Sequence, residues 1–236
     1  MILRAWRARL PGWIGIGVQS LDNPPLPWPG ESLSSGAVAV RRREFAAGRA
    51  AARQALARAG LVATAIPAGP DRAPLWPDGA TGSISHSRHI AVALASDIRH
   101  TCGIGVDTEP ALPLQADLRA EIVGPDDRLS GADLPDLVAA RLCFSVKETV
   151  FKAQFPLTRR WLDFRDIAVG LTPAGFTVSG TGLTGGWISV SGQLISWLIA
   201  APEQQGELCS LGPHVMARER PLPGSVAHGL QRLARG

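Results

Sequence analysis

The sequence lacks long apolar runs and contains no tyrosine. Its apolar residues come in short interrupted stretches that never reach the roughly 18 residues of a membrane span. Residues 1–10 mix three arginines with apolar residues and have no continuous apolar core before a small-residue cleavage site, so no secretory signal is expected. These absences predict a cytoplasmic protein with no membrane span. The missing tyrosine, beside abundant Ala, Gly, Pro and Arg, reflects genomic base composition and excludes no function.

Cysteine is also scarce. Cys102, Cys143 and Cys209 are widely spaced and odd in number, which argues against a disulfide framework or a CxxC metal site. Their apolar surroundings predict three buried free thiols.

Length and charge set wider bounds. A chain of 236 residues with 45% hydrophobic and 19% charged residues is typical of a globular protein of one or two domains. The formal net charge is +4, and nearly all of the cationic charge is on arginine, whose forked guanidinium suits phosphate. The basic balance predicts an anionic partner without deciding between a phosphate ligand, a nucleic acid and an acidic protein.

Turn and periodicity signals predict two helices among short strands. The prolines around Trp28 indicate an irregular loop, residues 41–59 a helix that stops at Gly60, and residues 134–153 a second helix before Pro156. Three strands, expected to be neighbours, precede the second helix and four follow it: 83–85, 90–95, 104–106, 167–171, 175–178, 187–190 and 194–200. The recurring order predicts an α+β fold of two similar halves, although no sequence repeat proves a duplication. The tail from residue 213 predicts a short helix near its end.

The segment Gly103-Ile104-Gly105-Val106-Asp107-Thr108-Glu109-Pro110 carries the first chemical signal. Strand alternation places Asp107 and Glu109 on one face. Two carboxylates projecting together at a strand end suit Mg²⁺, which binds a few carboxylates along with water and phosphate oxygens. Taken alone, an acidic strand end is more often a solvated turn.

The second signal, Phe144-Ser145-Val146-Lys147-Glu148-Thr149-Val150-Phe151-Lys152-Ala153, lies in the second predicted helix. The ordinary interpretation of Glu148 and Lys152 is an i,i+4 surface pair worth ~0.3–0.5 kcal/mol. Phe144 and Phe151 lie toward the same face, however, which indicates that the face is partly buried and that its charges have partners.

The third signal is Ser83-Ile84-Ser85-His86-Ser87, where a strand meets a turn. It lacks the GxSxG pattern of serine hydrolases. A lone histidine is usually structural, but hydroxyls beside a histidine can bind a phosphate. The preceding 71–79 segment, which contains Arg72, reads as a constrained turn.

Together these segments resemble the 4'-phosphopantetheinyl transferase superfamily, in particular its larger monomeric class and the enterobactin-synthase component D-like enzymes. The resemblance covers about residues 40–200 and is carried by the order and spacing of the segments 43–49, 71–77, 83–87, 105–109 and 144–158. It implies two similar α+β halves related by a pseudo-twofold around a central cleft that holds coenzyme A. Residues 1–106 would bind its 3'-phosphate, and residues 107–236 would contain the metal and the catalytic helix.

The resemblance also implies roles for individual residues. Asp107, Glu109 and Glu148 would be the ligands of Mg²⁺, and Asp107 and Lys152 would also bind coenzyme A. Ser85 and His86 would hold the 3'-phosphate with help from Arg49 and Arg53. Arg72 stands where many relatives have the lysine of a Gly-Lys-Pro turn, and its neighbours Asp71 and Ala73 depart from that pattern.

The implied reaction transfers 4'-phosphopantetheine from coenzyme A to a serine of an apo carrier protein of the acyl, peptidyl or aryl type, releasing adenosine 3',5'-bisphosphate. Glu148 would accept the serine proton and Lys152 would stabilise the leaving group. Because a metal-bound carboxylate is a poor base, Glu121 or a metal-bound water is an alternative. The enterobactin-like branch favours nonribosomal peptide and siderophore pathways.

Two other functions use the same residues. A magnesium-dependent phosphohydrolase acting on coenzyme A or a nucleotide would need the same carboxylates, with water as the nucleophile. A nucleic-acid module would use the arginines of residues 41–53 on phosphates, but the chain has no recognised nucleic-acid motif and its tryptophans are not interleaved with basic residues. The transferase is therefore the predicted function, with no nucleic-acid partner.

Overall fold

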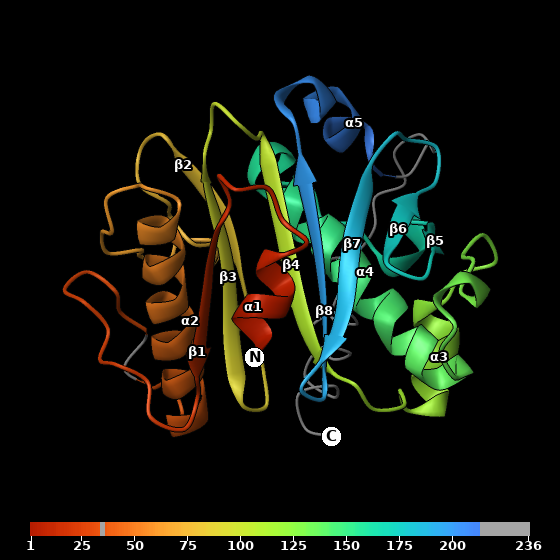
Figure 1. Cartoon of the computed structure of the whole chain (residues 1–236), viewed down its shortest axis with the longest axis horizontal. Helices are drawn as coiled ribbons and strands as arrows, with labels where there is room; N and C mark the ends of the chain where they lie inside the picture. The colour runs from red at the N-terminus through yellow and green to blue at the C-terminus, as the bar shows by residue number, and fades with distance from the viewer. Residues whose placement is uncertain (34–35, 213–236) are drawn as a thin grey trace.

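Two antiparallel sheets lie side by side, with strand orders β1-β3-β2 and β4-β8-β7-β6-β5 (Figure 1). The computed structural model describes residues 1–33 and 36–212, so the helix predicted in the tail lies outside the described residues. Within those ranges no helix is both long and apolar enough to cross a bilayer. The strands are β1 (Gly15–Ser20), β2 (Ala80–Ser87), β3 (Ile90–Asp97), β4 (Gly103–Pro110), β5 (Val169–Leu171), β6 (Gly175–Val178), β7 (Thr184–Val190) and β8 (Gln193–Ala200). The α-helices are α1 (Ile2–Arg7), α2 (Ala39–Arg58), α3 (Ala116–Ile122), α4 (Asp136–Thr158) and α5 (Gln205–Ser210).

Each sheet packs one long helix against a strand that carries two glycines. On α2 the contacts are at Ala51 and Ala55, and on α4 they are at Thr149 and Ala153, again four residues apart. A Cβ on the facing glycines would overlap or crowd the carbonyl oxygens of these helix residues, so the helices come closer than any side chain would permit. The glycines are Gly15 and Gly17 of β1, and Gly103 and Gly105 of β4.

The same four letters, Gly-Ile-Gly-Val, occupy residues 15–18 and 103–106. In both places the glycines face the long helix, while the isoleucines Ile16 and Ile104 point to the opposite face and join one apolar cluster. The prediction of an α+β fold with two similar halves is therefore confirmed. The division after residue 106 falls inside β4 and stays a prediction.

The two sheets meet along a seam between β2 and β4. The hydroxyl of Ser83 accepts a hydrogen bond from the Val106 amide (3.1 Å), and that of Ser85 accepts one from the Thr108 amide (3.4 Å). These side chains replace a backbone ladder. The expectation that the first three predicted strands are neighbours is only partly right, because β2 pairs with β3 whereas β4 pairs with β8.

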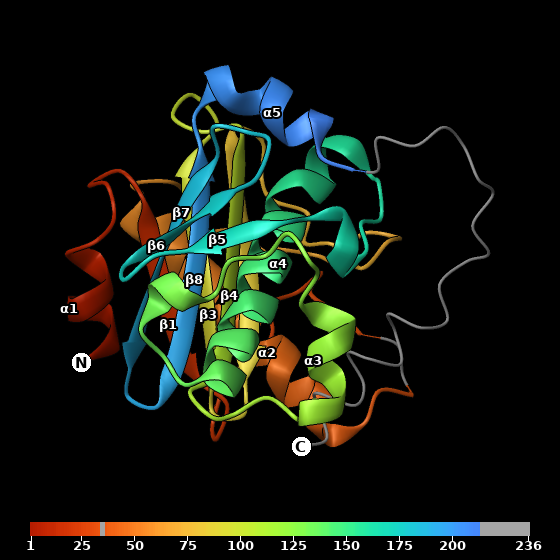
Figure 2. The same cartoon turned by 90° about the vertical axis from the view of Figure 1, so that its right-hand side faces the viewer.

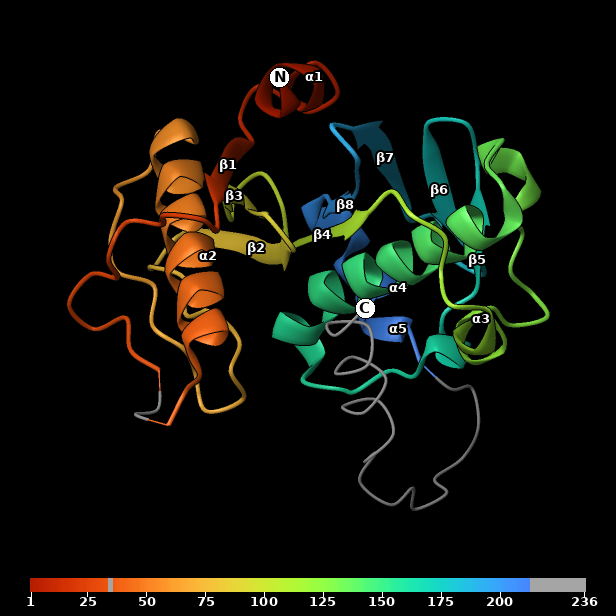
Figure 3. The same ribbon diagram turned by 90° about the horizontal axis from the view of Figure 1, so that it is seen from below.

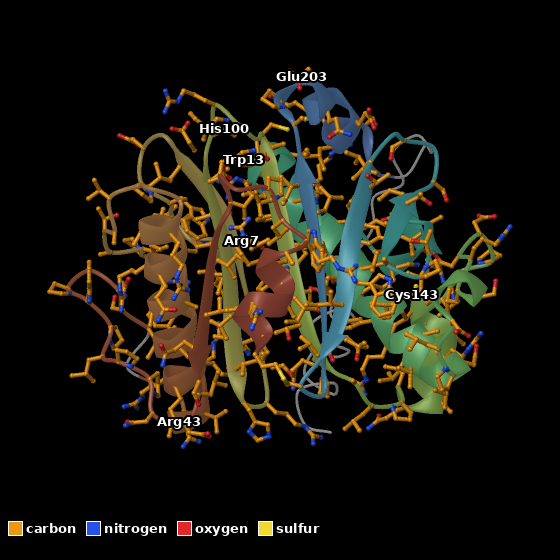
Figure 4. The ribbon with its side chains drawn as sticks, in the orientation of Figure 1. Arg7, Trp13, Arg43, His100, Cys143 and Glu203 are labelled. Atoms are coloured by element: carbon orange, nitrogen blue, oxygen red, sulfur yellow. The ribbon has the colours of Figure 1, made fainter. Side chains whose placement is uncertain are left out.

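Helix α1 covers the face of the sheets that lies opposite α2 and α4 (Figures 1 and 2). Its buried Trp6 packs with Trp197 of β8 (ring centroids 6.0 Å apart) in a core that takes residues from both sheets. Trp13 and His100, next to each other in Figure 4, stack at 5.1 Å and join the β1 side of the molecule to the loop before β4. The N-terminal segment thus holds the two halves together.

Several element boundaries differ from the sequence prediction. The second helix extends past Pro156 to Thr158, because Arg159 adopts a left-handed φ of 55° and its amide bonds the Phe155 carbonyl. The side chain of Gln154 also holds this turn by donating to the Arg160 carbonyl (2.9 Å). The sequence analysis missed β1, α1, α3 and α5, which are short and interrupted by polar residues or glycine.

Cysteine burial is also only partly as predicted. Cys143 is buried in the core of the larger sheet, and Cys102 is partly buried. Cys209 is exposed on α5, so the prediction of three buried thiols is wrong at that position.

The close contact between β4 and α4 gives a direct test. We expect Gly105→Ala to lower the free energy of unfolding by at least about 2 kcal/mol, because its methyl group would displace the Thr149 carbonyl. Gly206→Ala in α5, where a Cβ meets nothing within 4 Å, is the matched control and should be neutral or stabilising by up to about 1 kcal/mol. Urea denaturation measures both, and equal stability of the two variants would contradict the account.

Candidate active site

Asp107, Ser85 and Lys152 meet at the seam between the sheets. Lys152 Nζ donates to Asp107 Oδ1 (2.6 Å) and to Ser85 Oγ (3.2 Å), and Ser85 Oγ donates to the same carboxylate oxygen (2.8 Å). The three side chains come from β4, β2 and α4, so both halves contribute. Figure 3 shows α4 crossing beneath β4, beside the end of β2. Lys152 pairs with Asp107 instead of forming an ordinary i,i+4 surface pair with Glu148, as the predicted partial burial of this helix face indicated.

Strand and helix periodicity explain the meeting. On β4 the residues 103, 105, 107 and 109 alternate onto the face toward α4, and on α4 the residues 141, 145, 148 and 152 recur at helical spacing. Three buried hydroxyls fix the helix above β8: Ser196 Oγ lies 2.8 Å from Ser145 Oγ and 2.7 Å from Thr149 Oγ1. Since Ser196 is the β8 residue paired with Asp107, these bonds position α4 relative to that carboxylate.

Glu109, the second predicted metal ligand, is held by an arginine that the sequence analysis missed. Arg141 NH1 lies 2.9 Å from Glu109 Oε2, while Arg141 Nε and NH2 donate to the carbonyls of Leu112 (2.8 Å) and Pro113 (3.0 Å). Arg141 is nearly buried. It precedes Glu148 by seven residues, two helical turns, and that spacing was the signal that could have identified it.

Glu148 lies beside this cluster and receives no hydrogen bond from any described residue. Burial, with a smaller contribution from Asp107, raises the pKa of Glu148 to about 7 although Lys152 opposes the shift. Burial and Asp107 likewise raise the pKa of Glu109 to about 7 against the effect of Arg141. Burial lowers the pKa of Lys152, but Asp107 and Glu148 outweigh it and the net shift is upward. The site holds more negative charge than its own cations balance.

The donor set fits a divalent cation. Within the described residues, no three His, Cys, Asp or Glu side chains stand close enough to form a metal cluster, since Lys152 lies on Asp107 and Arg141 on Glu109. Asp107 Oδ2, however, is buried and has no hydrogen-bond partner among the residues that the structure describes. A buried carboxylate oxygen without a partner, next to two glutamates with raised pKa values, has the chemistry that a hard cation satisfies.

His86 lies in a small polar cluster at the end of β2. Its Nε2 lies 3.1 Å from Arg41 NH1 and 3.7 Å from Glu44 Oε2, and Arg41 and Glu44 form an ion pair of 3.2 Å. Burial lowers the pKa of His86, Arg41 lowers it further, and Glu44 opposes the shift. Arg41, which was not among the predicted site residues, therefore adds a cation beside Ser85 and His86.

The three predicted arginines do not gather at this point. Arg49 is buried over the Phe45 ring (4.4 Å), its Nε has no hydrogen-bond partner within residues 1–33 and 36–212, and burial lowers its pKa to about 10. Arg53 stacks over Trp28 (4.5 Å) and pairs with buried Glu31, so its guanidinium already has a structural partner. Arg72 is exposed with a φ of 67° in the loop before β2.

A small groove lies beside α4 and includes Glu148 in its lining. Phe151, Phe155 and Trp161 form an aromatic cluster with ring centroids 5.2–5.4 Å apart, and Trp161 is 61% exposed. Residues from α4 and the following loop line the groove: Lys147, Glu148, Phe151, Trp161, Leu162, Asp163, Phe164 and Ile167. The groove thus combines apolar side chains with two carboxylates.

The N-terminal half carries an uncharged counterpart of the site. Gln19 follows Gly17 as Asp107 follows Gly105, and Gln54 precedes Ala55 as Lys152 precedes Ala153. Gln54 Nε2 donates to Gln19 Oε1 (3.2 Å), at the position equivalent to the Lys152–Asp107 pair. The similar halves therefore hold one charged site and one neutral copy.

Carboxylates, a partly buried lysine and hydroxyls at the junction of two halves suit an enzyme that acts on a phosphate ester or anhydride. Comparison with known proteins agrees. Residues 30–96 match the profile of the 4'-phosphopantetheinyl transferase N-terminal domain, and residues 103–191 match that of the 4'-phosphopantetheinyl transferase superfamily.

Two relatives cover more than two thirds of the chain, and a third covers about half of it. It is 36% identical to 4'-phosphopantetheinyl transferase Svp of Streptomyces mobaraensis over 227 residues, which is 85% of this chain and 91% of that protein. It is 36% identical to 4'-phosphopantetheinyl transferase PptT of Mycobacterium tuberculosis over 71% of this chain and 74% of that one. Enterobactin synthase component D of Salmonella typhi is 42% identical over 48% of each chain.

The chain belongs to the 4'-phosphopantetheinyl transferase superfamily. The predicted family and enzyme class are confirmed, and its reaction is the transfer of the phosphopantetheine group of coenzyme A to carrier proteins. This result favours the transferase over the phosphohydrolase and the nucleic-acid module.

The raised pKa of Glu148 predicts a pH-dependent stability. Between its ordinary value of 4.5 and about 7, the folded state binds more protons at this group than the unfolded state. The free energy of unfolding should therefore fall as the pH rises through this window, by about 1–3 kcal/mol for Glu148.

Urea denaturation at pH 5 and pH 8 in a metal chelator measures the loss. Glu148→Gln should reduce the difference in free energy of unfolding between the two pH values. It should not abolish the difference, because the raised pKa of Glu109 contributes with the same sign. The same difference in Glu148→Gln as in the wild type would contradict a raised pKa of Glu148.

Proposed function

We propose that Asp107, Glu109 and Glu148 hold Mg²⁺ at the seam and that a carrier serine attacks the diphosphate of coenzyme A there. The observation that carries the proposal is the Lys152–Asp107–Ser85 cluster, with its one unpartnered buried carboxylate oxygen, beside a glutamate that has no hydrogen bond. When bound, Mg²⁺ would neutralise charge on the diphosphate. The remaining chemistry is assigned to the residues of the chain.

Glu148 is the proposed general base. No described residue donates to its oxygens, which leaves the oxygen that does not face the metal available to accept a proton. The serine oxygen forms a bond to the β-phosphorus of coenzyme A, the bond from that phosphorus to the oxygen bridging the α-phosphate breaks, and the serine proton goes to Glu148. Glu121 is exposed on α3, which supports Glu148 as the base. A metal-bound water is the remaining alternative.

Lys152 is proposed to stabilise the leaving adenosine 3',5'-bisphosphate. Its Nζ is already at the seam, and one ion pair on a flexible stem lets it turn from Asp107 to a phosphate oxygen. Ser85, His86 and the nearby Arg41 form the proposed 3'-phosphate site. Arg49 is kept in this proposal because its Nε is unpartnered, whereas the roles of Arg53 and Arg72 stay predictions.

The transfer reaction is tested by the intact mass of a purified apo carrier protein. With this enzyme, coenzyme A and Mg²⁺, the carrier should gain one phosphopantetheine, and a chelator should prevent the gain. Glu148→Gln should lower the rate by about 100-fold or more, because a general base contributes roughly that factor.

Glu121→Gln is the matched control for the alternative base and should leave the rate unchanged. A reduced transfer rate in Glu121→Gln, with a normal rate in Glu148→Gln, would identify Glu121 as the general base instead. Release of free phosphopantetheine without any carrier modification would support the phosphohydrolase instead.

The pantetheine arm is proposed to lie in the groove along α4. Phe151 and Trp161 in its lining offer apolar contact, and the proposed base Glu148 also lines the groove. Trp161→Ala should weaken coenzyme A binding about tenfold, because it removes a large apolar contact.

Isothermal titration calorimetry of the variant with coenzyme A and with adenosine 3',5'-bisphosphate separates the two ends of the ligand. The bisphosphate lacks the arm and should bind as tightly as to the wild type. Equal weakening of both ligands would place the tryptophan at the nucleotide end.

The cellular setting also belongs to the proposal. The family and its relatives support an enzyme that works as a monomer in the cytoplasm on acyl, peptidyl or aryl carrier domains. The similarity to enterobactin synthase component D favours nonribosomal peptide and siderophore assembly.

A further inference from the structure

Arg141 is the most constrained charged residue at the site and has no role in the mechanism above. Its three nitrogens donate to Glu109 Oε2 (2.9 Å) and to the carbonyls of Leu112 (2.8 Å) and Pro113 (3.0 Å). The ion pair is largely shielded, with side-chain exposures of 11% for Arg141 and 17% for Glu109. A guanidinium with three fixed acceptors cannot swing away as Lys152 can.

The formal charges of the site determine how a divalent cation can bind beside the fixed Arg141. Asp107, Glu109 and Glu148 supply three negative charges, and Lys152 and Arg141 supply two positive ones. A divalent cation alone would change the net charge from −1 to +1 in a partly buried place, where unbalanced charge is costly. A diphosphate that arrives with the cation restores a net negative charge.

We propose that Arg141 is a permanent internal counter-ion of Glu109 that makes divalent-cation binding at this site depend on the diphosphate of coenzyme A. Lys152 can leave Asp107 for a phosphate, but Arg141 stays and continues to balance Glu109. Metal and coenzyme A therefore strengthen each other's binding by the same factor, as linkage requires. The proposal rests on the metal site in the proposed function.

In the N-terminal half the position of Glu109 is taken by Leu21, and that of Arg141 by Arg43. Arg43 is exposed on α2, whereas Arg141 is buried. The arginine at this helix position is therefore buried only in the half where a carboxylate faces it.

The test is a titration of the full-length protein with Mn²⁺, followed by electron paramagnetic resonance of the free ion, which needs no turnover. In the wild type, coenzyme A should raise Mn²⁺ affinity at least about tenfold, and adenosine 3'-monophosphate, which has no diphosphate, should not. Arg141→Met should bind Mn²⁺ alone about three- to tenfold more tightly, because one positive charge near the cation is gone. Its enhancement by coenzyme A should shrink in proportion.

Two variants separate charge from scaffolding. Arg141→Lys keeps the positive charge but loses the hydrogen bonds to the two carbonyls. It should retain the wild-type enhancement of Mn²⁺ affinity by coenzyme A. Arg119→Met removes a comparable ion pair, with Asp136 (2.8 Å), on the surface between α3 and α4, and should behave as wild type. Thermal melting checks that each variant is folded.

The opposite results overturn the proposal. Equal Mn²⁺ affinity of the wild type with and without coenzyme A would do so, and this measurement stands even if Arg141→Met does not fold. Weaker Mn²⁺ binding by Arg141→Met with an unchanged enhancement would show that Arg141 only holds Glu109 in place. Absence of Mn²⁺ binding by the wild type under every condition would instead refute the metal site of the proposed function.

Discussion

The position of the active site depends on one backbone contact, the approach of α4 to the glycines of β4. Gly103 and Gly105 have no Cβ, so the helix backbone at Thr149 and Ala153 lies directly on the strand. A helix held at side-chain distance would place Lys152 too far from Asp107 for an ion pair of 2.6 Å. The hydroxyls of Ser196, Ser145 and Thr149 then fix the rotation of α4. Chemistry at this seam is therefore a consequence of residues with no reactive side chain.

Buried charge is the second organising feature. The chain has only two lysines, Lys147 and Lys152, and both lie in α4 on either side of Glu148. Lys147 Nζ donates to the carbonyls of Ile122 and Phe164 and to Asp127 (2.6–2.9 Å), which uses all three of its protons. Breaking such a pair would leave an uncompensated buried charge, at a cost of about 3–5 kcal/mol. Lys147 thus anchors the loops beside the groove, while Lys152 faces the seam between the sheets.

The two halves share a backbone arrangement but differ in the side chains that it carries. Gly-Ile-Gly-Val strands and close-packed helices recur, but the Lys152–Asp107 pair of β4 and α4 is replaced on β1 and α2 by the Gln19–Gln54 pair. The N-terminal half instead contributes Ser85 and the cations around His86. A symmetric fold can therefore build one asymmetric site, because the two halves supply different side chains at the seam.

The sequence by itself determined the α+β class, the two long helices and the carboxylate strand, and it predicted Asp107, Glu109, Glu148 and Lys152 as site residues. Strand alternation, helical spacing and glycine stops are local signals, because each can be recognised within one segment of the sequence. Only the tertiary structure decided that Lys152 pairs with Asp107, that Arg141 holds Glu109, and that Arg53 is taken by Glu31. These pairings join residues 22 to 45 positions apart. Since opposite charges attract at any sequence separation, the choice among many arginines and carboxylates is made by packing, which no local pattern records.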